Sequence, residues 1–159
     1  MHKGRYSKYL RPIVILIDLL IINLLVLVCL RTAMSNIGYH AILSVFWLLT
    51  AYYSGFYEVY RTTKETSILI KLIKQFFFIW IITFAYVGFK YKYVTTNEIF
   101  EYIFVSFLVV GFFKFLVFFL LKKYRIHYRG NIRRIILIGS KKNTSELTDY
   151  FEKNQYLGY

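Results

Sequence analysis

The sequence predicts a mostly α-helical integral membrane protein, in which four transmembrane helices precede the beginning of an α/β module. Composition is the first observation behind this prediction: 58% of the 159 residues are hydrophobic and 21% are aromatic. The second is layout, because four long apolar segments follow one another and basic residues close them on alternate sides. A soluble domain of this length keeps too much surface to bury four such helices together.

The four apolar segments run from Ile13 to Leu30, from about His40 to Phe56, from about Ile68 to Phe89 and from about Ile99 to Leu121. At about 1.5 Å per helical residue, even the shortest covers most of the ~30 Å hydrocarbon thickness of a bilayer. The first segment exceeds the usual apolar length of a signal peptide and lacks a clear small-residue cleavage site. We therefore expect it to remain as a membrane span.

The formal net charge of +13 is distributed unevenly along the chain. With a cytoplasmic amino terminus, the two expected outer loops hold only Arg31, Lys90 and Lys92, and the other basic residues outside the apolar segments lie in the expected cytoplasmic pieces. This bias predicts a multi-pass protein with both termini in the cytoplasm. No basic segment interleaved with aromatic residues lies elsewhere, so we expect no nucleic-acid partner.

A basic cluster follows the fourth segment. It comprises Lys122, Lys123, Arg125, Arg129, Arg133 and Arg134. One interpretation is that the cluster sets the topology and holds the following residues against anionic lipids of the bilayer. The other is a specific role in attracting a lipid phosphate or a nucleotide. Tyrosines near the expected interfaces, Tyr57 among them, are expected to be membrane anchors.

Polar residues interrupt two of the apolar segments: Asp18 and Asn23 lie in the first and Lys114 lies in the fourth. Such residues tend to face protein and to serve function. Asp18 and Lys114 lie at similar depths, about 8–10 Å from the cytoplasmic ends of their segments, so they could pair. Alternatively, Lys114 extends to the inner headgroups while Asp18 is protonated or bonds a neighbouring helix.

The sequence gives little support for metal or thiol chemistry. His2, His40 and His127 have no second ligand at metal spacing nearby. Cys29 is the single cysteine, which excludes an intramolecular disulfide, and its place near the end of the first segment favours a packing role.

The composition changes near the carboxyl end of the chain. The run Ile135–Ile138, which ends at Gly139, is typical of a buried parallel strand. Asn143 with Glu146 resembles a capping box, which would open a helix to about Lys153. A strand, a turn and a helix are how a Rossmann-like module begins.

This unit is a weak candidate for cofactor binding. If Gly139 is the first glycine of G-x-G-x-x-G, Lys141 and Thr144 occupy the next two glycine positions, and the close approach of backbone to phosphate is lost. A single parallel strand also cannot satisfy its edges without partners. We therefore expect these residues to be the front of a longer protein, in which residues 1–124 form the transmembrane domain and residues 125–159 a basic linker with the start of a cytosolic module.

Three features of the sequence follow one another in an order that resembles a known family. They are the intramembrane Asp18, the run Gly55-Phe56-Tyr57 followed by Arg61, and the run from Arg133 to Gly139. The stretch from Tyr57 to Arg61 and the carboxyl-terminal residues from Gly139 onwards belong to the same pattern. Across essentially all 159 residues, this order resembles the amino-terminal part of the large polyisoprenyl-phosphate hexose-1-phosphate transferases, the undecaprenyl-phosphate glucose phosphotransferases that start bacterial exopolysaccharide and capsule repeats.

The resemblance implies four transmembrane helices, a cytosolic Rossmann-like module and then a catalytic domain with an Asp-Glu pair, in the bacterial inner membrane. It implies Mg²⁺-assisted attack of undecaprenyl phosphate on a UDP-sugar, which gives a sugar-diphospho-undecaprenol and UMP. No residue of this chain matches the catalytic signature. The implied role of these residues is therefore to position the enzyme at the inner leaflet, where both substrates arrive.

Two other interpretations stay open. Membrane-bound nucleotide-sugar dehydratases and epimerases resemble the same front end, but they continue with a glycine-rich turn and a Tyr-x-x-x-Lys pair, and the turn after Gly139 departs from the glycine pattern. A non-catalytic membrane scaffold for polysaccharide assembly is the third interpretation. The oligomeric state is left open.

Overall fold

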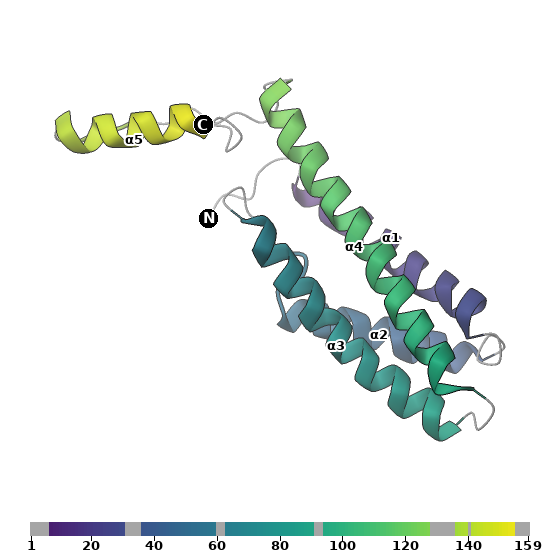
Figure 1. Cartoon of the computed structure of the whole chain (residues 1–159). Helices are drawn as coiled ribbons and strands as arrows, with labels where there is room; N and C mark the ends of the chain where they lie inside the picture. Colours follow the sequence, from purple (N-terminus) through teal and green to yellow (C-terminus); the bar gives the residue numbers. More distant parts are fainter. Residues whose placement is uncertain are drawn as a thin grey trace.

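The computed structural model describes residues 7–30, 36–59, 63–90, 94–127, 136–139 and 141–154. This part of the chain is all helical. Its five helices are α1 (Ser7–Cys29), α2 (Ile37–Tyr53), α3 (Glu65–Lys90), α4 (Thr96–His127) and α5 (Lys141–Lys153). The first four form one bundle in which each helix packs against the next and α1 also packs against α4, while α5 lies apart (Figure 1).

The four bundle helices alternate in direction (Figure 1). Lys122 near the end of α4 therefore meets Glu65 at the start of α3, with 3.4 Å between Nζ and Oε1. We call this the basic end of the bundle, since the start of α1, the start of α3 and the end of α4 all carry basic residues there. These residues are Arg11, Lys71, Lys74, Lys122 and Lys123.

The interior is built from side chains that recur every three or four residues, so that one face of each helix turns inward. The buried positions include Val14, Asp18, Ile22 and Val26 in α1, Tyr39, Leu43, Trp47 and Ala51 in α2, Leu72, Phe76, Ile79 and Thr83 in α3, and Ile99, Tyr102, Ser106 and Val110 in α4. The inward faces include polar side chains, whereas the outward faces carry many large apolar ones, such as Leu16, Leu20 and Phe112. Hydrocarbon is the solvent that suits such a surface.

Three of the helices are long and apolar enough to cross a membrane: Tyr9–Cys29, Glu65–Lys90 and Thr96–Tyr124. This agrees with the prediction of a mostly α-helical membrane protein. The second apolar segment also forms a helix, but α2 has only 17 residues. At about 1.5 Å per residue its length is about 26 Å, less than the ~30 Å of the hydrocarbon layer.

Local signals set both ends of α2. At its start, the side chain of Asn36 accepts a hydrogen bond of 2.9 Å from the backbone N–H of Gly38. At its end, Gly55 has a φ of 60°, a left-handed conformation that glycine adopts without strain. The N–H of Phe56 donates to the carbonyl of Ala51 at 3.0 Å, which is one bond of a Schellman motif. The chain therefore turns back toward the bundle immediately after α2.

The strand expected over Ile135–Ile138 is not formed in the part of the chain that the structure describes. Residues 136–138 have no regular secondary structure, and Ile136 and Ile138 are 88% and 93% exposed. A parallel strand needs a neighbour to pair its N–H and C=O groups, and no strand is present among the described residues to supply one. An apolar, β-branched run alone does not form a strand.

The helix expected from Asn143 begins two residues earlier, at Lys141. Asn143 therefore lies within the first turn of α5 and is not the residue that caps it. A Cβ placed on Gly139 would approach the side chain of Thr144 no closer than 3.7 Å, an ordinary contact. A side chain at position 139 would therefore meet no steric obstacle.

Candidate functional site

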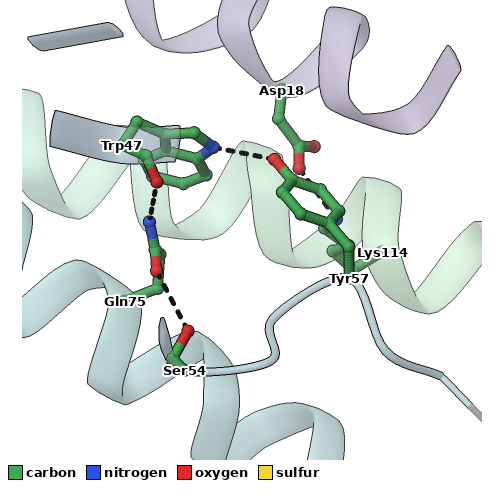
Figure 2. A network of polar contacts seen from close by, with 6 residues as sticks. All are labelled: Asp18, Trp47, Ser54, Tyr57, Gln75 and Lys114. Atoms are coloured by element: carbon green, nitrogen blue, oxygen red, sulfur yellow. Dashed lines mark hydrogen bonds and ion pairs between the residues drawn. The ribbon is translucent and has the colours of Figure 1, made fainter. Parts of the chain in front are cut away.

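An ion pair is buried between α1 and α4. The Nζ of Lys114 lies 2.7 Å from Oδ2 of Asp18, and the two side chains are 9% and 0% exposed (Figure 2). The structure thus brings together two residues that the sequence places at similar depths, and Lys114 does not extend toward the headgroups. Each charge alone would cost several kcal/mol away from water, so the two favour each other's burial.

Two aromatic rings also face the Lys114 ammonium. Its Nζ lies 4.4 Å from the centroid of the Phe56 ring and 4.1 Å from that of the Tyr57 ring. Both distances lie well within the ~6 Å range of cation–π attraction. Phe56 and Tyr57 belong to the turn that follows α2, so the ammonium joins α4 to this turn as well as to α1.

Trp47 of α2 fixes the two rings. Its Nε1–H donates a hydrogen bond of 2.8 Å to the hydroxyl of Tyr57 (Figure 2). Its ring also meets the ring of Phe56 edge to face, with 5.7 Å between centroids and an interplanar angle of 86°. Tyr57 had been expected at the membrane interface. The turn at Gly55 and the bond from Trp47 direct it into the bundle instead.

The same turn is tied to α3 by a lysine. The Nζ of Lys71 donates to the backbone carbonyl oxygens of Gly55 and Glu58, with 2.7 Å in each case. The carbonyl of Gly55 also accepts from the N–H of Glu58 at 3.0 Å, so Lys71 reinforces a turn that already has a backbone hydrogen bond. The lysine therefore holds the turn in the conformation that presents both rings to Lys114.

A buried glutamine links α3 to the last turns of α2. The Nε2 of Gln75 donates to the carbonyl of Trp47 at 3.0 Å and to Oγ1 of Thr50 at 2.8 Å. Its Oε1 accepts from the hydroxyl of Ser54 at a longer 3.4 Å (Figure 2). Sequence reasoning missed Gln75, although a lone amide within an apolar segment is the same kind of signal that Asp18 gives.

A second group of polar side chains lies between α1 and α2 and is held by hydrogen bonds. Asn23 donates through Nδ2 to the hydroxyl of Ser44 at 3.0 Å and to the carbonyl of Leu19 at 2.8 Å. Its Oδ1 lies 2.8 Å from Nδ1 of His40. These bonds satisfy Asn23, which the sequence had marked as an intramembrane polar residue.

The basic cluster predicted after the fourth segment is described only in part. Lys122 pairs with Glu65, and Lys123 is exposed. Arg125 lies in α4, but the structure does not describe its side chain. Arg129, Arg133 and Arg134 lie outside the described residues.

The described part of the chain holds no group of side chains that could ligate a metal ion. No three His, Cys, Asp or Glu side chains gather there. Asp18, the one buried acidic residue among those described, already faces the ammonium of Lys114.

Comparisons with known protein families, with curated proteins and with solved structures find no match. The buried polar groups described above mostly bond one another across helix boundaries. This arrangement fixes the helices of the bundle relative to each other.

Proposed function

We propose that this chain is the membrane-anchoring amino-terminal portion of a polyisoprenyl-phosphate hexose-1-phosphate transferase. In this proposal the full-length enzyme transfers hexose-1-phosphate from a UDP-sugar to undecaprenyl phosphate. One observation supports it most directly: Asp18, Phe56 and Tyr57, residues that carry the sequence resemblance, surround a single ammonium although they are distant in sequence. The residues that carry the resemblance thus also share one contact, the ammonium of Lys114.

The proposed topology has four crossings and both termini in the cytoplasm of a bacterium. The basic end of the bundle then lies at the inner leaflet, as the positive-inside rule requires. The short α2 completes its crossing with the turn at residues 54–57. Backbone groups that leave a helix inside a membrane need internal partners. The carbonyl of Gly55 accepts from the N–H of Glu58 and from Lys71, and the carbonyl of Glu58 accepts from Lys71.

The proposed contribution to activity is positioning. An enzyme that joins a lipid phosphate to a nucleotide sugar works at the boundary between bilayer and cytosol. A rigid anchor holds the enzyme at this boundary, so the enzyme does not have to find its lipid substrate by diffusion through the cell. Holding reactants close together raises their effective concentration. Lys122 and Lys123 would add attraction to anionic headgroups at the same level.

Topology can be tested with reporter fusions on the full chain. Green fluorescent protein fused after residue 154 should fluoresce, because it folds in the cytoplasm, and alkaline phosphatase inserted at residue 93 should be active, because it requires export. The chain should stay in the membrane pellet after an alkaline carbonate wash. An active phosphatase after residue 154, or extraction by carbonate, would contradict the proposed anchor.

Activity can be tested in membranes of the natural host. Membranes with the intact gene should transfer label from a UDP-sugar into the lipid fraction and release UMP in the presence of Mg²⁺, and membranes from a strain with the gene disrupted should not. Undiminished transfer after disruption would overturn the transferase proposal. Accumulation of a 4-keto or epimerised nucleotide sugar without a lipid-linked product would favour the dehydratase or epimerase interpretation instead.

A further inference from the structure

We infer that Asp18, Phe56 and Tyr57 form a binding cage for a primary alkylammonium group, and that Lys114 is the tethered ligand of this cage. The inference does not depend on the proposed transferase function. It goes beyond an ion pair, because an ion pair requires only two opposite charges. A cage also requires the positive charge to be on the α4 side, where it faces both rings.

The geometry sets this requirement. The face of an aromatic ring carries negative potential, and the Lys114 ammonium lies over the rings of both Phe56 and Tyr57. The carboxylate of Asp18 lies on a further side at 2.7 Å. The carboxylate and the two ring faces are therefore all negative or electron-rich where they meet the ammonium. A carboxylate on α4 in the same place would be repelled by both ring faces.

The residues that form the walls of the cage all lie outside α4. Asp18 comes from α1, and the rings of Phe56 and Tyr57 are held by contacts with Trp47 of α2. Lys71 of α3 fixes the backbone of the turn. Only the ligand comes from α4. We therefore expect the site to keep its shape when the lysine side chain is shortened, as a preorganised binding site does.

Charge reversal separates a cage from a simple ion pair. The double variant Asp18→Lys/Lys114→Asp restores opposite charges but places the carboxylate on the α4 side. We expect its melting temperature, measured on the purified full chain in detergent, to stay as low as that of the single variants. The matched control is Glu65→Lys/Lys122→Glu, which reverses an exposed pair with side chains 51% and 33% exposed. This control should melt close to the unmodified protein, since exposed pairs contribute little. Full recovery of the Asp18→Lys/Lys114→Asp protein would overturn the cage.

Chemical rescue tests the ligand class directly. Lys114→Ala removes the atoms from Cγ to Nζ, which together have the size of n-propylammonium. Added n-propylammonium should raise the melting temperature of the Lys114→Ala protein in a saturable way and leave the unmodified protein unchanged. n-Propanol, which has a similar size and no charge, should not do so. Equal effects of the two compounds would show that the space is only an apolar cavity and would overturn the inference.

The rings supply the second half of the test. Adding Tyr57→Leu to the Lys114→Ala protein should weaken the apparent affinity for n-propylammonium about five- to thirtyfold, the factor expected from losing one desolvated cation–π contact. With Lys114 intact, Tyr57→Phe should melt above Tyr57→Leu, because phenylalanine keeps the ring face and loses only the hydroxyl. This comparison works even if Lys114→Ala does not fold. Equal melting of the Tyr57→Phe and Tyr57→Leu proteins would overturn the cage.

Discussion

The ammonium of Lys71 lies 2.7 Å from the carbonyl oxygen of Gly55, so a side chain of α3 holds the turn that follows α2. The helix dipole makes the carboxyl end of α2 negative, and an ammonium beside it is therefore favourable. By sequence, Lys71 is one of several basic residues that indicate topology. The structure gives it a specific local partner as well.

Replacing Lys71 with methionine should destabilise the bundle. The change removes two charge-assisted hydrogen bonds, one of which is exposed to solvent, so we expect a loss of about 2 kcal/mol in the free energy of unfolding. Thermal or denaturant unfolding in detergent micelles measures it. Lys74→Met, on the same helix at an exposed position, is the matched control and should change stability by no more than about 0.5 kcal/mol. Equal losses in the two proteins would contradict the role given to Lys71.

Gly55 should tolerate substitution poorly because of its backbone. At a φ of 60°, an alanine side chain clashes with its own backbone, which costs about 1–2 kcal/mol. Space is not the obstacle, since a Cβ there would lie 3.5 Å from the nearest atom. Gly55→Asn should therefore lose less stability than Gly55→Ala, because asparagine visits this conformation more readily. Gly88→Ala, in an open helical position, should raise stability by up to about 1 kcal/mol. The opposite order would show that backbone conformation is not what matters.

The helices and the similar depths of Asp18 and Lys114 follow from rules that a single sequence contains. Apolar runs of membrane-spanning length have few alternatives to a helix in hydrocarbon, because every backbone group must be satisfied within the chain. The fixed rise per residue then places both charges at similar depths. Which faces of α1 and α4 meet was left open by the sequence, since it depends on how all four helices pack.

The rings around Lys114 could not be predicted in the same way. Tyr57 follows an apolar segment, which is where an interface anchor is expected. Its actual position depends on the left-handed φ of Gly55 and on the bond from Trp47, which are a local and a tertiary effect acting together. The run at residues 136–138 gives the converse lesson, because its apolar pattern predicted a strand but strand formation depends on a partner.

Gln75 should contribute less than its burial suggests. Gln75→Leu removes the bonds to the carbonyl of Trp47 and the hydroxyl of Thr50, but Thr50 still donates to the carbonyl of Phe46 at 2.9 Å. Hydrogen bonds between helices in membranes average about 0.6 kcal/mol, so we expect a loss of about 1 kcal/mol for the pair. Ser54→Ala, which removes only the 3.4 Å bond, should lose less still. Unfolding in micelles compares the three proteins, and a larger loss for Ser54→Ala would contradict this ranking.

The ion pair between Asp18 and Lys114 should show strong coupling in a double-mutant cycle. Asp18→Asn leaves a buried ammonium without its counter-charge, and Lys114→Met leaves a buried carboxylate in the same condition, so each should lose about 3–5 kcal/mol. The double variant has neither charge and should recover much of this loss. Unfolding measured in micelles on all four proteins gives the interaction energy, which we expect to exceed about 2 kcal/mol. Additive losses would mean that the two residues act independently, and the ion pair would then contribute nothing to holding α4 against α1.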